Sequence, residues 1–511
     1  MLQTAAVPSS FSLTLANEPA MHKFMRDLAT MLEPGDLVTL SGDLGAGKTT
    51  LARALIRHLA ADQTIAVPSP TFTLMQSYDL PRFPLVHADL FRLDGPGELT
   101  ELGFDDLPKE AVVLLEWPDR AAGVLPPDRL DIAFTLSPQH GIEFRNVRVT
   151  GYGTFAPRAE RNFAVRRFLD TTAYAEAERW RIQGDASSRV YERLTLPDKH
   201  AILMISPRRP DGPPVRNGKP YSAIAHLAED VKPFVAMSNG LRQIGLSAPQ
   251  VLDAELAQGL LLIEDLGPEI VVTGDPPAPI EERYRAAVEV LVELHRYQLS
   301  DSLAVSPHVE YKLPRYDMDA LLIEVELLLD WYLPRMGVEV SADMRKSYVT
   351  LWRKALQGAV EAKPTWVLRD FHSPNLIWLP NRKDLSRVGL LDFQDAVMGP
   401  PAYDLASLLQ DARVDVPDAM EISLLGHYVR TRSAIDEEFK APAFIALYST
   451  LAAQRASKIL GIFARLEKRD GKPQYLRHMP RVWRYLQRAL AHPSLAQLKL
   501  WYGSKVPAWK E

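Results

Sequence analysis

The residues Gly42-Asp43-Leu44-Gly45-Ala46-Gly47-Lys48-Thr49 decide the fold of the first third of the chain. They follow the apolar run 37–40, open a predicted helix, and match the phosphate-binding pattern G-x-x-x-x-G-K-[ST]. In such a loop, backbone N–H groups surround the phosphates, the lysine reaches the terminal phosphates, and the hydroxyl holds Mg²⁺. The segment predicts an ATP and Mg²⁺ site whose candidate contacts are Gly42, Gly45, Gly47, Lys48, Thr49 and Thr50.

Strand and helix signals alternate on both sides of this loop, which is typical of an α/β layer fold. The short apolar runs predict strands, and the longer run with helical periodicity, ended by Pro34-Gly35, predicts a helix. The predicted strands are 11–15, 37–40, 85–88, 112–115 and 130–134, and the predicted helix is 18–32.

Three further segments in this region carry polar residues after a turn or a strand. Thr71 lies in Ser69-Pro70-Thr71-Phe72, where a proline-stiffened switch segment could sense the γ-phosphate. Asp89 lies in His87-Ala88-Asp89-Leu90-Phe91-Arg92, and Glu116 and Trp117 lie in Leu115-Glu116-Trp117-Pro118. Taken alone, the first segment is better explained by turn chemistry and the second by a solvated carboxylate.

In this order and spacing, the loop and the three segments resemble the small ATPase (TsaE type) of bacterial threonylcarbamoyladenosine synthesis on tRNA. The resemblance covers about residues 10–150. It implies that Lys48 and Thr49 bind ATP and Mg²⁺, that Thr71 belongs to the switch, and that Asp89 assists the metal. It also implies that Glu116 and Trp117 close the nucleotide site.

The charge of the first third bears on its partners. Residues 1–150 hold 12 Lys+Arg and 19 Asp+Glu, a net charge of 12 − 19 = −7, although the whole chain has a net charge of only −5. Affinity for nucleic acid comes largely from Lys and Arg. We therefore expect no tight direct binding of nucleic acid, and the resemblance implies protein partners, the subunits of the tRNA threonylcarbamoyl-transfer complex.

A second constellation lies near residue 370. Asp370 precedes Asn375 by five residues in Arg369-Asp370-Phe371-His372-Ser373-Pro374-Asn375, and Asp392 ends the apolar run 388–391. This is the layout of kinase-fold phosphotransferases, in which the first Asp orients or deprotonates the acceptor hydroxyl while the Asn and the second Asp hold Mg²⁺. The segment predicts Asp370 as the catalytic residue, with Asn375 and Asp392 as metal ligands.

Other segments fit a kinase-like nucleotide site. Gly184-Asp185-Ala186-Ser187-Ser188-Arg189 precedes a predicted strand, where a loop over ATP phosphates belongs, so Gly184, Ser187, Ser188 and Arg189 are candidate contacts. The run 260–264 ends at Glu264 like the hinge strand beside adenine. Asp404 stands at a helix start, where helix capping is the expected role.

The region 163–511 resembles the aminoglycoside phosphotransferase superfamily, and within it the anomeric kinases (AmgK type) of N-acetylmuramate and N-acetylglucosamine. The resemblance implies phosphorylation of the C1 hydroxyl of an amino sugar in peptidoglycan recycling. The chain departs from the superfamily at Leu368 and Arg369, where a His and a Gly are usual. The strand 201–206 also lacks the phosphate-binding Lys, for which Arg189, Arg193 or Arg208 could substitute.

We therefore expect an α/β P-loop ATPase domain over residues 1–152, a linker over 153–162, and a bilobal protein-kinase-like α+β domain. Its N-lobe is expected over 163–267 and its helical C-lobe over 268–511. Two alternatives to the sugar kinase stay open: a kinase of another small alcohol (aminoglycoside, choline or homoserine) and a non-catalytic regulatory module. A basic run in the C-terminal helices suits an anionic substrate, and a solvated helix face explains it too; it comprises Arg465, Arg477, Arg481, Arg484 and Arg488.

Composition sets the remaining expectations. The 511 residues contain no cysteine, which excludes disulfides, thiolate metal sites and a Cys nucleophile. The first residues lack the pattern of a secretory signal, and no apolar run reaches the length of a membrane span. We expect a cytoplasmic protein without membrane association. The sequence does not indicate coupling between the two activities.

Overall fold

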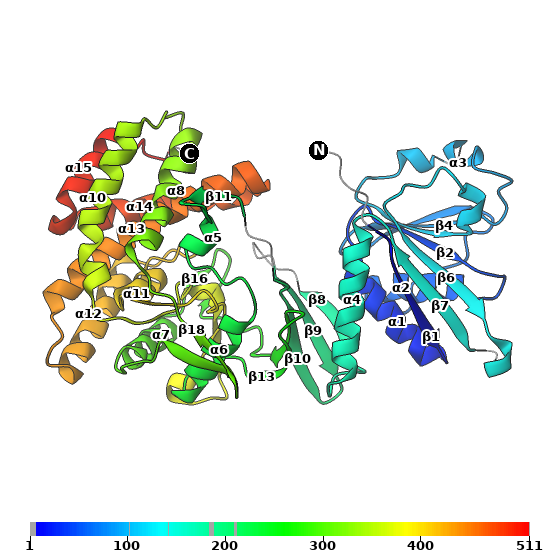
Figure 1. Cartoon of the computed structure of the whole chain (residues 1–511), viewed down its shortest axis with the longest axis horizontal. Coiled ribbons are helices and arrows are strands. Elements are labelled where there is room, and N and C mark those ends of the chain that lie inside the picture. Colours follow the sequence, from blue (N-terminus) through cyan, green and yellow to red (C-terminus); the bar gives the residue numbers. More distant parts are fainter. Residues whose placement is uncertain (1–6, 102, 142, 183–188, 209–211, 510–511) are drawn as a thin grey trace. The chain divides into compact units, whose positions relative to one another are not determined.

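The computed structural model describes residues 7–101, 103–141, 143–182, 189–208 and 212–509. The chain forms two compact units, Met1–Met204 and Ile205–Glu511, and each is described here by itself (Figure 1). The division falls inside strand β10 (Lys199–Ile205). It does not coincide with the predicted boundary at 153–162.

The first unit alternates strands and helices, as expected from its sequence. Its other strands are β1 (Ser9–Leu15), β2 (Leu37–Ser41), β3 (Met75–Asp79), β4 (Pro84–Asp89), β5 (Val112–Glu116), β6 (Leu130–Leu136), β7 (Arg145–Gly151), β8 (Glu178–Ile182) and β9 (Val190–Leu196). Its helices are α1 (Glu18–Met31), α2 (Lys48–Leu59), α3 (Glu98–Glu101) and α4 (Phe155–Asp170), with short 3₁₀ turns η1 (Phe104–Asp106), η2 (Pro118–Ala121) and η3 (Pro138–His140).

Seven of these strands form one sheet in the order β1-β7-β6-β2-β5-β4-β3. The inner strands β6, β2, β5 and β4 run parallel, whereas β1, β7 and β3 are antiparallel to their neighbours. Parallel strands carry their ligand sites at their carboxyl ends. The register places Leu40 beside Glu116 and Glu116 beside Asp89 at that edge.

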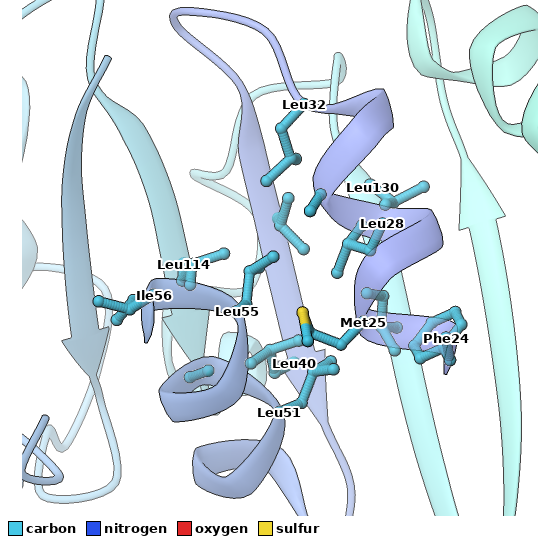
Figure 2. Close-up of a cluster of buried hydrophobic side chains, with 14 of the residues drawn as sticks. Phe24, Met25, Leu28, Leu32, Leu40, Leu51, Leu55, Ile56, Leu114 and Leu130 are labelled. Atoms are coloured by element: carbon cyan, nitrogen blue, oxygen red, sulfur yellow. The ribbon is translucent and has the colours of Figure 1, made fainter. Parts of the chain in front are cut away.

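Helices α1 and α2 bury their apolar faces on this sheet (Figure 2). Asn17 begins α1 by accepting a hydrogen bond from the Ala20 amide at 3.0 Å. From there Phe24 and Leu28 recur at helical spacing and pack with Leu40 of β2 and Leu55 of α2. Burial of such side chains stabilises the layer by about 1.5–3 kcal/mol each, and it holds the loop between β2 and α2 on a rigid support.

The predicted linker at 153–162 is wrong for most of its length, because residues 155–170 form helix α4. The sequence shows no clear amphipathic period there, because arginines interrupt the apolar residues between Phe155 and Leu169. Arg158, for example, binds Asp36 at 2.7 Å. Buried apolar side chains and tertiary ion pairs together stabilise this helix, which packs on α1 and β7.

The second unit is mainly helical. Its helices are α5 (Tyr221–Ile224), α6 (Lys232–Gln243), α7 (Glu281–Leu294), α8 (Met318–Leu327), the π-helical turn η4 (Leu328–Tyr332), α9 (Leu333–Arg335), α10 (Ala342–Glu361), α11 (Ala402–Leu409), α12 (Asp418–Ile435), α13 (Ala441–Asp470), α14 (Met479–Leu490) and α15 (Ala496–Lys505). Its 3₁₀ turns are η5 (Ser373–Asn375), η6 (Asp384–Arg387), η7 (Pro473–His478) and η8 (Pro493–Leu495).

The strands of the second unit are short; most of them pair two by two, whereas β13 and β14 belong to a five-stranded sheet. They are β11 (Pro214–Arg216), β12 (Lys219–Pro220), β13 (Val251–Glu255), β14 (Leu260–Glu264), β15 (Val272–Thr273), β16 (Ala278–Pro279), β17 (Ser302–Ser306), β18 (Val309–Lys312), β19 (Thr365–Val367), β20 (Leu376–Trp378), β21 (Val388–Leu390) and β22 (Val397–Gly399). The long helix α13 packs against α8, α11 and α14. Within the described residues, no helix combines the length and apolar character needed to cross a membrane.

Candidate active sites

The glycine-rich loop between β2 and α2 has the backbone shape that phosphate binding needs. Gly42, Gly45 and Gly47 have φ angles of 132°, 80° and 110°, which side chains rarely adopt. A Cβ at Gly42 would lie 2.5 Å from the carbonyl oxygen of Phe134, so that position is closed to larger residues. The loop residues predicted from the sequence therefore form one turn at the start of α2, the glycine cradle, whose shape would suit a phosphate.

Lys48 occupies the centre of this cradle. Its Nζ donates to the carbonyl oxygens of Gly42 at 2.7 Å and Asp43 at 3.0 Å, and it lies 3.8 Å from the centre of the Trp117 ring. Burial lowers the pKa of Lys48, and the nearby Glu116 carboxylate opposes that shift. The ammonium group is thus held on acceptors that a phosphate can replace, while Thr50 is exposed on the first turn of α2.

The carboxyl ends of β4 and β5 place two acidic residues beside the cradle. Asp89 and Glu116 are register partners. Thr49 donates its hydroxyl to Glu116 at 2.9 Å, and the buried His87 ring contacts the other Glu116 oxygen at 2.9 Å. Hydroxyl and carboxylate oxygens are the ligands that Mg²⁺ prefers, so Thr49 and Asp89 fit the predicted metal site.

The Ser69-Pro70-Thr71 turn contacts this carboxylate pair. Ser69 and Thr71 both donate to Asp89, at 3.0 and 3.1 Å, and the Phe91 amide donates to its other oxygen at 3.0 Å. Thr71 thus lies where a switch residue would respond to a bound metal. Sequence reasoning assigned no role to Ser69 or His87, although both belong to the quoted motifs.

In the second unit, the loop after β19 presents Asp370. Arg369 has a φ of 68°, and Asp370 follows with 38% of its side chain exposed. Asn375 donates its side-chain amide to the backbone oxygen of Asp370 at 2.9 Å, and Leu391 donates its N–H to the Asn375 oxygen at 2.9 Å. The first bond joins Asn375 to Asp370, and the second joins Asn375 to the residue before Asp392. The three predicted residues of this site therefore lie on neighbouring turns.

Asp392 lies two residues after the end of β21 and has a φ of 56°, a left-handed conformation that is found at active-site turns. Gln394 donates to its Oδ1 at 2.8 Å. Asp392 and Asn375 are both half-buried, and the Asp392 carboxylate and the Asn375 side-chain oxygen are oxygen ligands. This donor set fits a magnesium ion shared with ATP phosphates.

The loop around Asp370 is fixed by a carboxylate from another helix. Asp404 of α11 is fully buried and accepts the amide N–H groups of Leu368 at 2.6 Å and Arg369 at 2.9 Å. The expected capping role of Asp404 is therefore wrong, because its oxygens are aimed away from its own helix. Burial raises the pKa of Asp404 to about 7, and the two N–H donors oppose the shift.

Side chains from α13 and from the loop after β19 lie around Asp370. Desolvation alone would raise the pKa of Asp370, but the Arg455 guanidinium, 3.9 Å away, and the His372 ring hold it below its ordinary value. Burial lowers the pKa of His372 to about 4. Asp370 is therefore ionised at neutral pH, and the buried His372 is neutral.

A buried ion network lies behind the same loop. Glu324 of α8 binds Arg369, accepts from Lys458 of α13 at 2.7 Å, and also accepts from Tyr316 and Gln454. Burial would raise the pKa of Glu324, but the two cations lower it to about 2. The sequence analysis assigned no role to Glu324, Lys458 or Arg455. The signal that could have found them is a charged residue within an apolar helical run.

The predicted nucleotide contacts of the kinase-like region are placed only in part. Gly184, Ser187 and Ser188 lie outside the described residues, and Arg189 is half-buried just before β9. The Glu264 carboxylate accepts from Arg382 at 2.5 Å and from the Gln250 amide at 3.1 Å. Its side chain is thus engaged in an ion pair at the end of β14.

Three of the five arginines in the basic run of the C-terminal helices are paired with carboxylates. Arg484 binds Asp415 at 2.9 Å, and Arg481 lies 3.5 Å from the same carboxylate. Arg488 binds Asp418 and Glu421. These pairs weaken the sequence-based argument that the run attracts an anionic substrate.

Comparison with known proteins gives two family matches. The family model described as "Threonylcarbamoyl adenosine biosynthesis protein TsaE" matches residues 15–144, and the "Phosphotransferase enzyme family" model matches residues 180–442.

Three curated relatives cover the same two regions. The N-acetylmuramate/N-acetylglucosamine kinase of Caulobacter vibrioides is 38% identical over 363 residues, which are 68% of this chain and 98% of that protein. The protein of the same name from Pseudomonas aeruginosa is 32% identical over 319 residues, covering 61% of this chain and 84% of the relative. The tRNA threonylcarbamoyladenosine biosynthesis protein TsaE of Rickettsia felis is 40% identical over 120 residues, covering 24% and 70%.

Proposed function

Because the chain belongs to the TsaE family in its first third and to the phosphotransferase enzyme family beyond it, we propose that it is a bifunctional ATP-using protein. The first region is an ATPase that supports formation of threonylcarbamoyladenosine at adenosine 37 of tRNA. The second is an ATP-dependent kinase of N-acetylmuramate and N-acetylglucosamine in peptidoglycan recycling.

The kinase assignment is carried by the hydrogen bonds that join Asp370, Asn375 and the turn to Asp392. In this proposal Asp370 accepts the proton of the sugar C1 hydroxyl, and its lowered pKa keeps it ionised for that task. Asn375 and Asp392 hold Mg²⁺, which neutralises charge on the transferred phosphoryl group when bound. Arg455 positions Asp370 from the side.

The ATPase assignment is carried by Lys48, whose ammonium rests in the glycine cradle. Gly42, Gly45 and Gly47 leave room for phosphates, Thr49 and Asp89 hold Mg²⁺, and Glu116 with Trp117 closes the nucleotide site. Thr71 donates a hydrogen bond to Asp89 and therefore responds when a metal binds to that carboxylate. The partners proposed for this region are the protein subunits of the threonylcarbamoyl-transfer complex, in keeping with its net negative charge.

One experiment tests the kinase. The purified full chain is incubated with Mg-ATP and a panel of N-acetylmuramate, N-acetylglucosamine, choline, homoserine and an aminoglycoside, and products are followed by phosphorus NMR. We expect a glycosyl 1-phosphate from the amino sugars. Turnover of only the amine-bearing alcohols would contradict the sugar assignment, and no turnover of any acceptor would favour the regulatory alternative.

A second experiment tests the partners of the ATPase. Binding of tRNA to the full chain is measured across a salt series, with and without the other subunits of the transfer complex. We expect weak binding to the chain alone and association through the protein subunits. Tight, salt-sensitive binding of tRNA by the chain alone would contradict this proposal.

A further inference from the structure

One half-buried arginine of the basic run has no carboxylate partner among the described residues. Arg465 lies on α13, whereas three other arginines of the run pair with acidic residues at or before the first turn of α12: Arg481, Arg484 and Arg488. The Nε of Arg465 is buried without a hydrogen-bond partner. Its guanidinium carbon lies 5.7 Å from the centre of the Tyr221 ring of α5. A guanidinium in this state has donors to offer to an anion that is not part of the chain.

The acidic residue near Arg465 is already engaged. Asp470, at the end of α13, binds Arg469 at 2.7 Å. Burial lowers the pKa of Arg465 and Arg469 lowers it further, whereas Tyr221 and Asp470 oppose the shift. The guanidinium stays charged all the same, because an arginine side chain does not lose its proton in proteins. A bound anion therefore offsets the cost of burying this charge.

Arg465 continues a row of basic residues on one face of α13. Arg455, Lys458 and Arg465 follow each other at intervals of three and seven residues, which places them along the same face of a helix. Arg455 lies 3.9 Å from the Asp370 carboxylate, and Lys458 binds Glu324 at 2.7 Å. Lys458 and Arg465 are separated by roughly 10 Å along the helix axis. These three residues, the α13 stripe, therefore begin beside Asp370 and end at Arg465.

The buried carboxylate beside the α13 stripe is saturated by other donors. Glu324 receives four hydrogen bonds, from Arg369, Lys458, Tyr316 and Gln454. A carboxylate has about four lone-pair sites, so Glu324 has no acceptor left for Arg465. The Tyr221 side chain lies near both residues: burial raises the pKa of Tyr221 to about 12, Glu324 adds to the shift, and Arg465 opposes it.

The α13 stripe approaches Asp370 at the group that would meet the acceptor. Arg455 approaches the Asp370 carboxylate, whereas Asn375, a proposed metal ligand, contacts the backbone oxygen of Asp370. In the proposed kinase reaction the acceptor hydroxyl faces the Asp370 carboxylate. A sugar bound in that way therefore has the α13 stripe as a neighbour.

From these contacts we propose that Arg465 binds the carboxylate of an acidic sugar whose C1 hydroxyl faces Asp370. The inference rests on the proposed sugar kinase activity and names a residue that selects the substrate. N-acetylmuramate fits, because its lactyl ether carries a carboxylate that N-acetylglucosamine lacks. A guanidinium binds a carboxylate through two parallel hydrogen bonds, so the pair favours the acidic sugar over the neutral one.

Direct binding to the full chain tests this without relying on phosphorylation. Isothermal titration calorimetry compares N-acetylmuramate with N-acetylglucosamine, each in the presence of a non-hydrolysable ATP analogue and Mg²⁺. We expect the parent to bind N-acetylmuramate about 10-fold more tightly, as one charge-assisted hydrogen bond provides, and Arg465→Gln to lose this preference. A parent that binds both sugars equally overturns the proposal.

A second variant and a control keep the result specific to Arg465. Arg465→Lys retains the charge but not the planar fork, so we expect it to lose part of the preference. Arg484→Gln is the matched control, since Arg484 belongs to the same basic run, pairs with Asp415, and has 64% of its side chain exposed. The control is expected to keep the parental preference. An unchanged preference in both Arg465 variants, or an equal loss in Arg484→Gln, overturns the proposal.

Steady-state kinetics gives the functional readout. In Arg465→Gln the ratio of kcat/KM for N-acetylmuramate to that for N-acetylglucosamine is expected to fall about 10-fold, through the KM for the acidic sugar. The KM for ATP is measured in the same variant, because a nucleotide phosphate is the other anion of the reaction. A rise confined to the KM for ATP assigns Arg465 to the nucleotide and overturns the proposal.

The two measurements together separate failure of this inference from failure of the proposed kinase function. Turnover of both sugars with an unchanged ratio in Arg465→Gln overturns the role of Arg465 and leaves the kinase function standing. A binding preference that depends on Arg465, without turnover of either sugar, overturns the kinase function and leaves the carboxylate site standing.

Discussion

The P-loop site and the kinase-like catalytic loop both gather carboxylates and hydroxyl-bearing residues, but their supports differ. The P-loop is a contiguous run whose lysine bonds to its own loop carbonyls at 2.7 and 3.0 Å. The Asp370 loop instead depends on Asp404 of α11, Arg455 of α13 and Glu324 of α8. A locally encoded site depends mainly on backbone conformation, whereas the assembled site depends on distant buried charges.

The largest expected effect separates the two chemistries. Asp370→Asn removes the carboxylate that accepts the acceptor proton, so we expect the kinase kcat to fall by about 10²–10⁴-fold. Nucleotide hydrolysis at the P-loop is expected to continue at its parental rate. Steady-state assays of both reactions on the same preparation check this, with Lys48→Ala as the reciprocal variant. Loss of both activities in Asp370→Asn would contradict separate chemistry.

The next prediction breaks the buried support of the kinase-like loop. Glu324→Gln leaves Arg369 and Lys458 buried without their carboxylate, and we expect the unfolding free energy to fall by about 3–5 kcal/mol. Urea unfolding followed by circular dichroism measures it. Glu467→Gln is the matched control, because its pair with Arg335 is 3.3 Å long and part-exposed, and should cost under about 1 kcal/mol. Equal effects in the two variants would argue against a buried network.

A glycine pair tests the local support of the P-loop. Gly42→Ala forces a Cβ to within 2.5 Å of the Phe134 oxygen at a φ of 132°, so we expect a loss of about 1–3 kcal/mol and of P-loop ATPase activity. Gly45→Ala, with a φ of 80° and no atom within 4 Å of the added Cβ, is the milder control. Thermal unfolding and nucleotide hydrolysis check both. A neutral Gly42→Ala would contradict the close approach.

The last prediction concerns pH. Burial raises the pKa of Asp404 from 3.8 to about 7, so the folded state holds a proton more tightly than the unfolded state between these values. The stability that Asp404 contributes is fully present below pH 3.8 and is lost as pH rises through about 7. We therefore expect the stability difference between the parent and Asp404→Asn to shrink by roughly 1 kcal/mol per pH unit over this range.

Urea unfolding of the two proteins between pH 4 and 7 measures that difference. Glu324→Gln is the contrasting control, because the lowered pKa of Glu324 confines its pH dependence to the acid side of 4.5. A difference between the parent and Asp404→Asn that grows with pH would contradict the raised pKa.

The sequence predicted the residues whose spacing is short and whose chemistry is specific. The loop 42–49, Asp89, Glu116, Asp370, Asn375 and Asp392 all come from such motifs, and the structure brings each set together. Five of the seven strands in the sheet around the P-loop were also predicted, because apolar or alternating runs of four or five residues indicate buried strands, whereas β3 and β7 were not predicted. The roles assigned to these residues stay predictions until the variants are measured.

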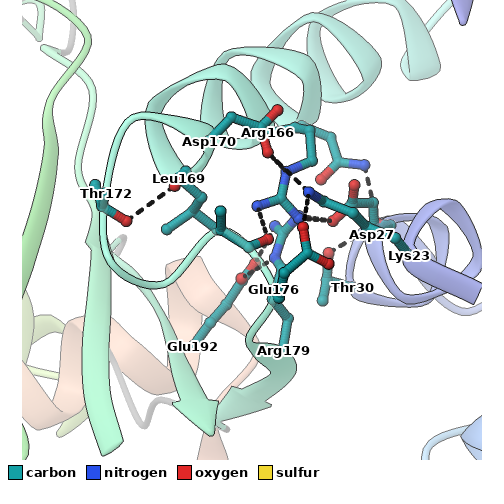
Figure 3. Close-up of polar contacts among 12 residues, drawn as sticks. Lys23, Asp27, Thr30, Arg166, Leu169, Asp170, Thr172, Glu176, Arg179 and Glu192 are labelled. Carbon is teal, nitrogen blue, oxygen red and sulfur yellow. Dashed lines mark hydrogen bonds and ion pairs between the residues drawn. The ribbon is translucent and has the colours of Figure 1, made fainter. Parts of the chain in front are cut away.

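Only the tertiary structure decided what lies between and behind the motifs. Helix α4 lies where the linker was expected. Its arginines form ion pairs with carboxylates on other elements, such as Asp36, and no local sequence pattern predicts these pairs. Asp404 was expected to cap its own helix, but it accepts a hydrogen bond from the Leu368 amide and supports the Asp370 loop. That partner is also distant in the sequence. A motif consists of residues that are close in the sequence, whereas the role of a buried charged residue depends on a partner that becomes its neighbour only on folding. Arg179 of β8, for example, donates hydrogen bonds to Asp27 of α1 and Glu192 of β9 (Figure 3). Because these residues are up to 165 positions apart in the chain, only the folded protein shows that they form one cluster.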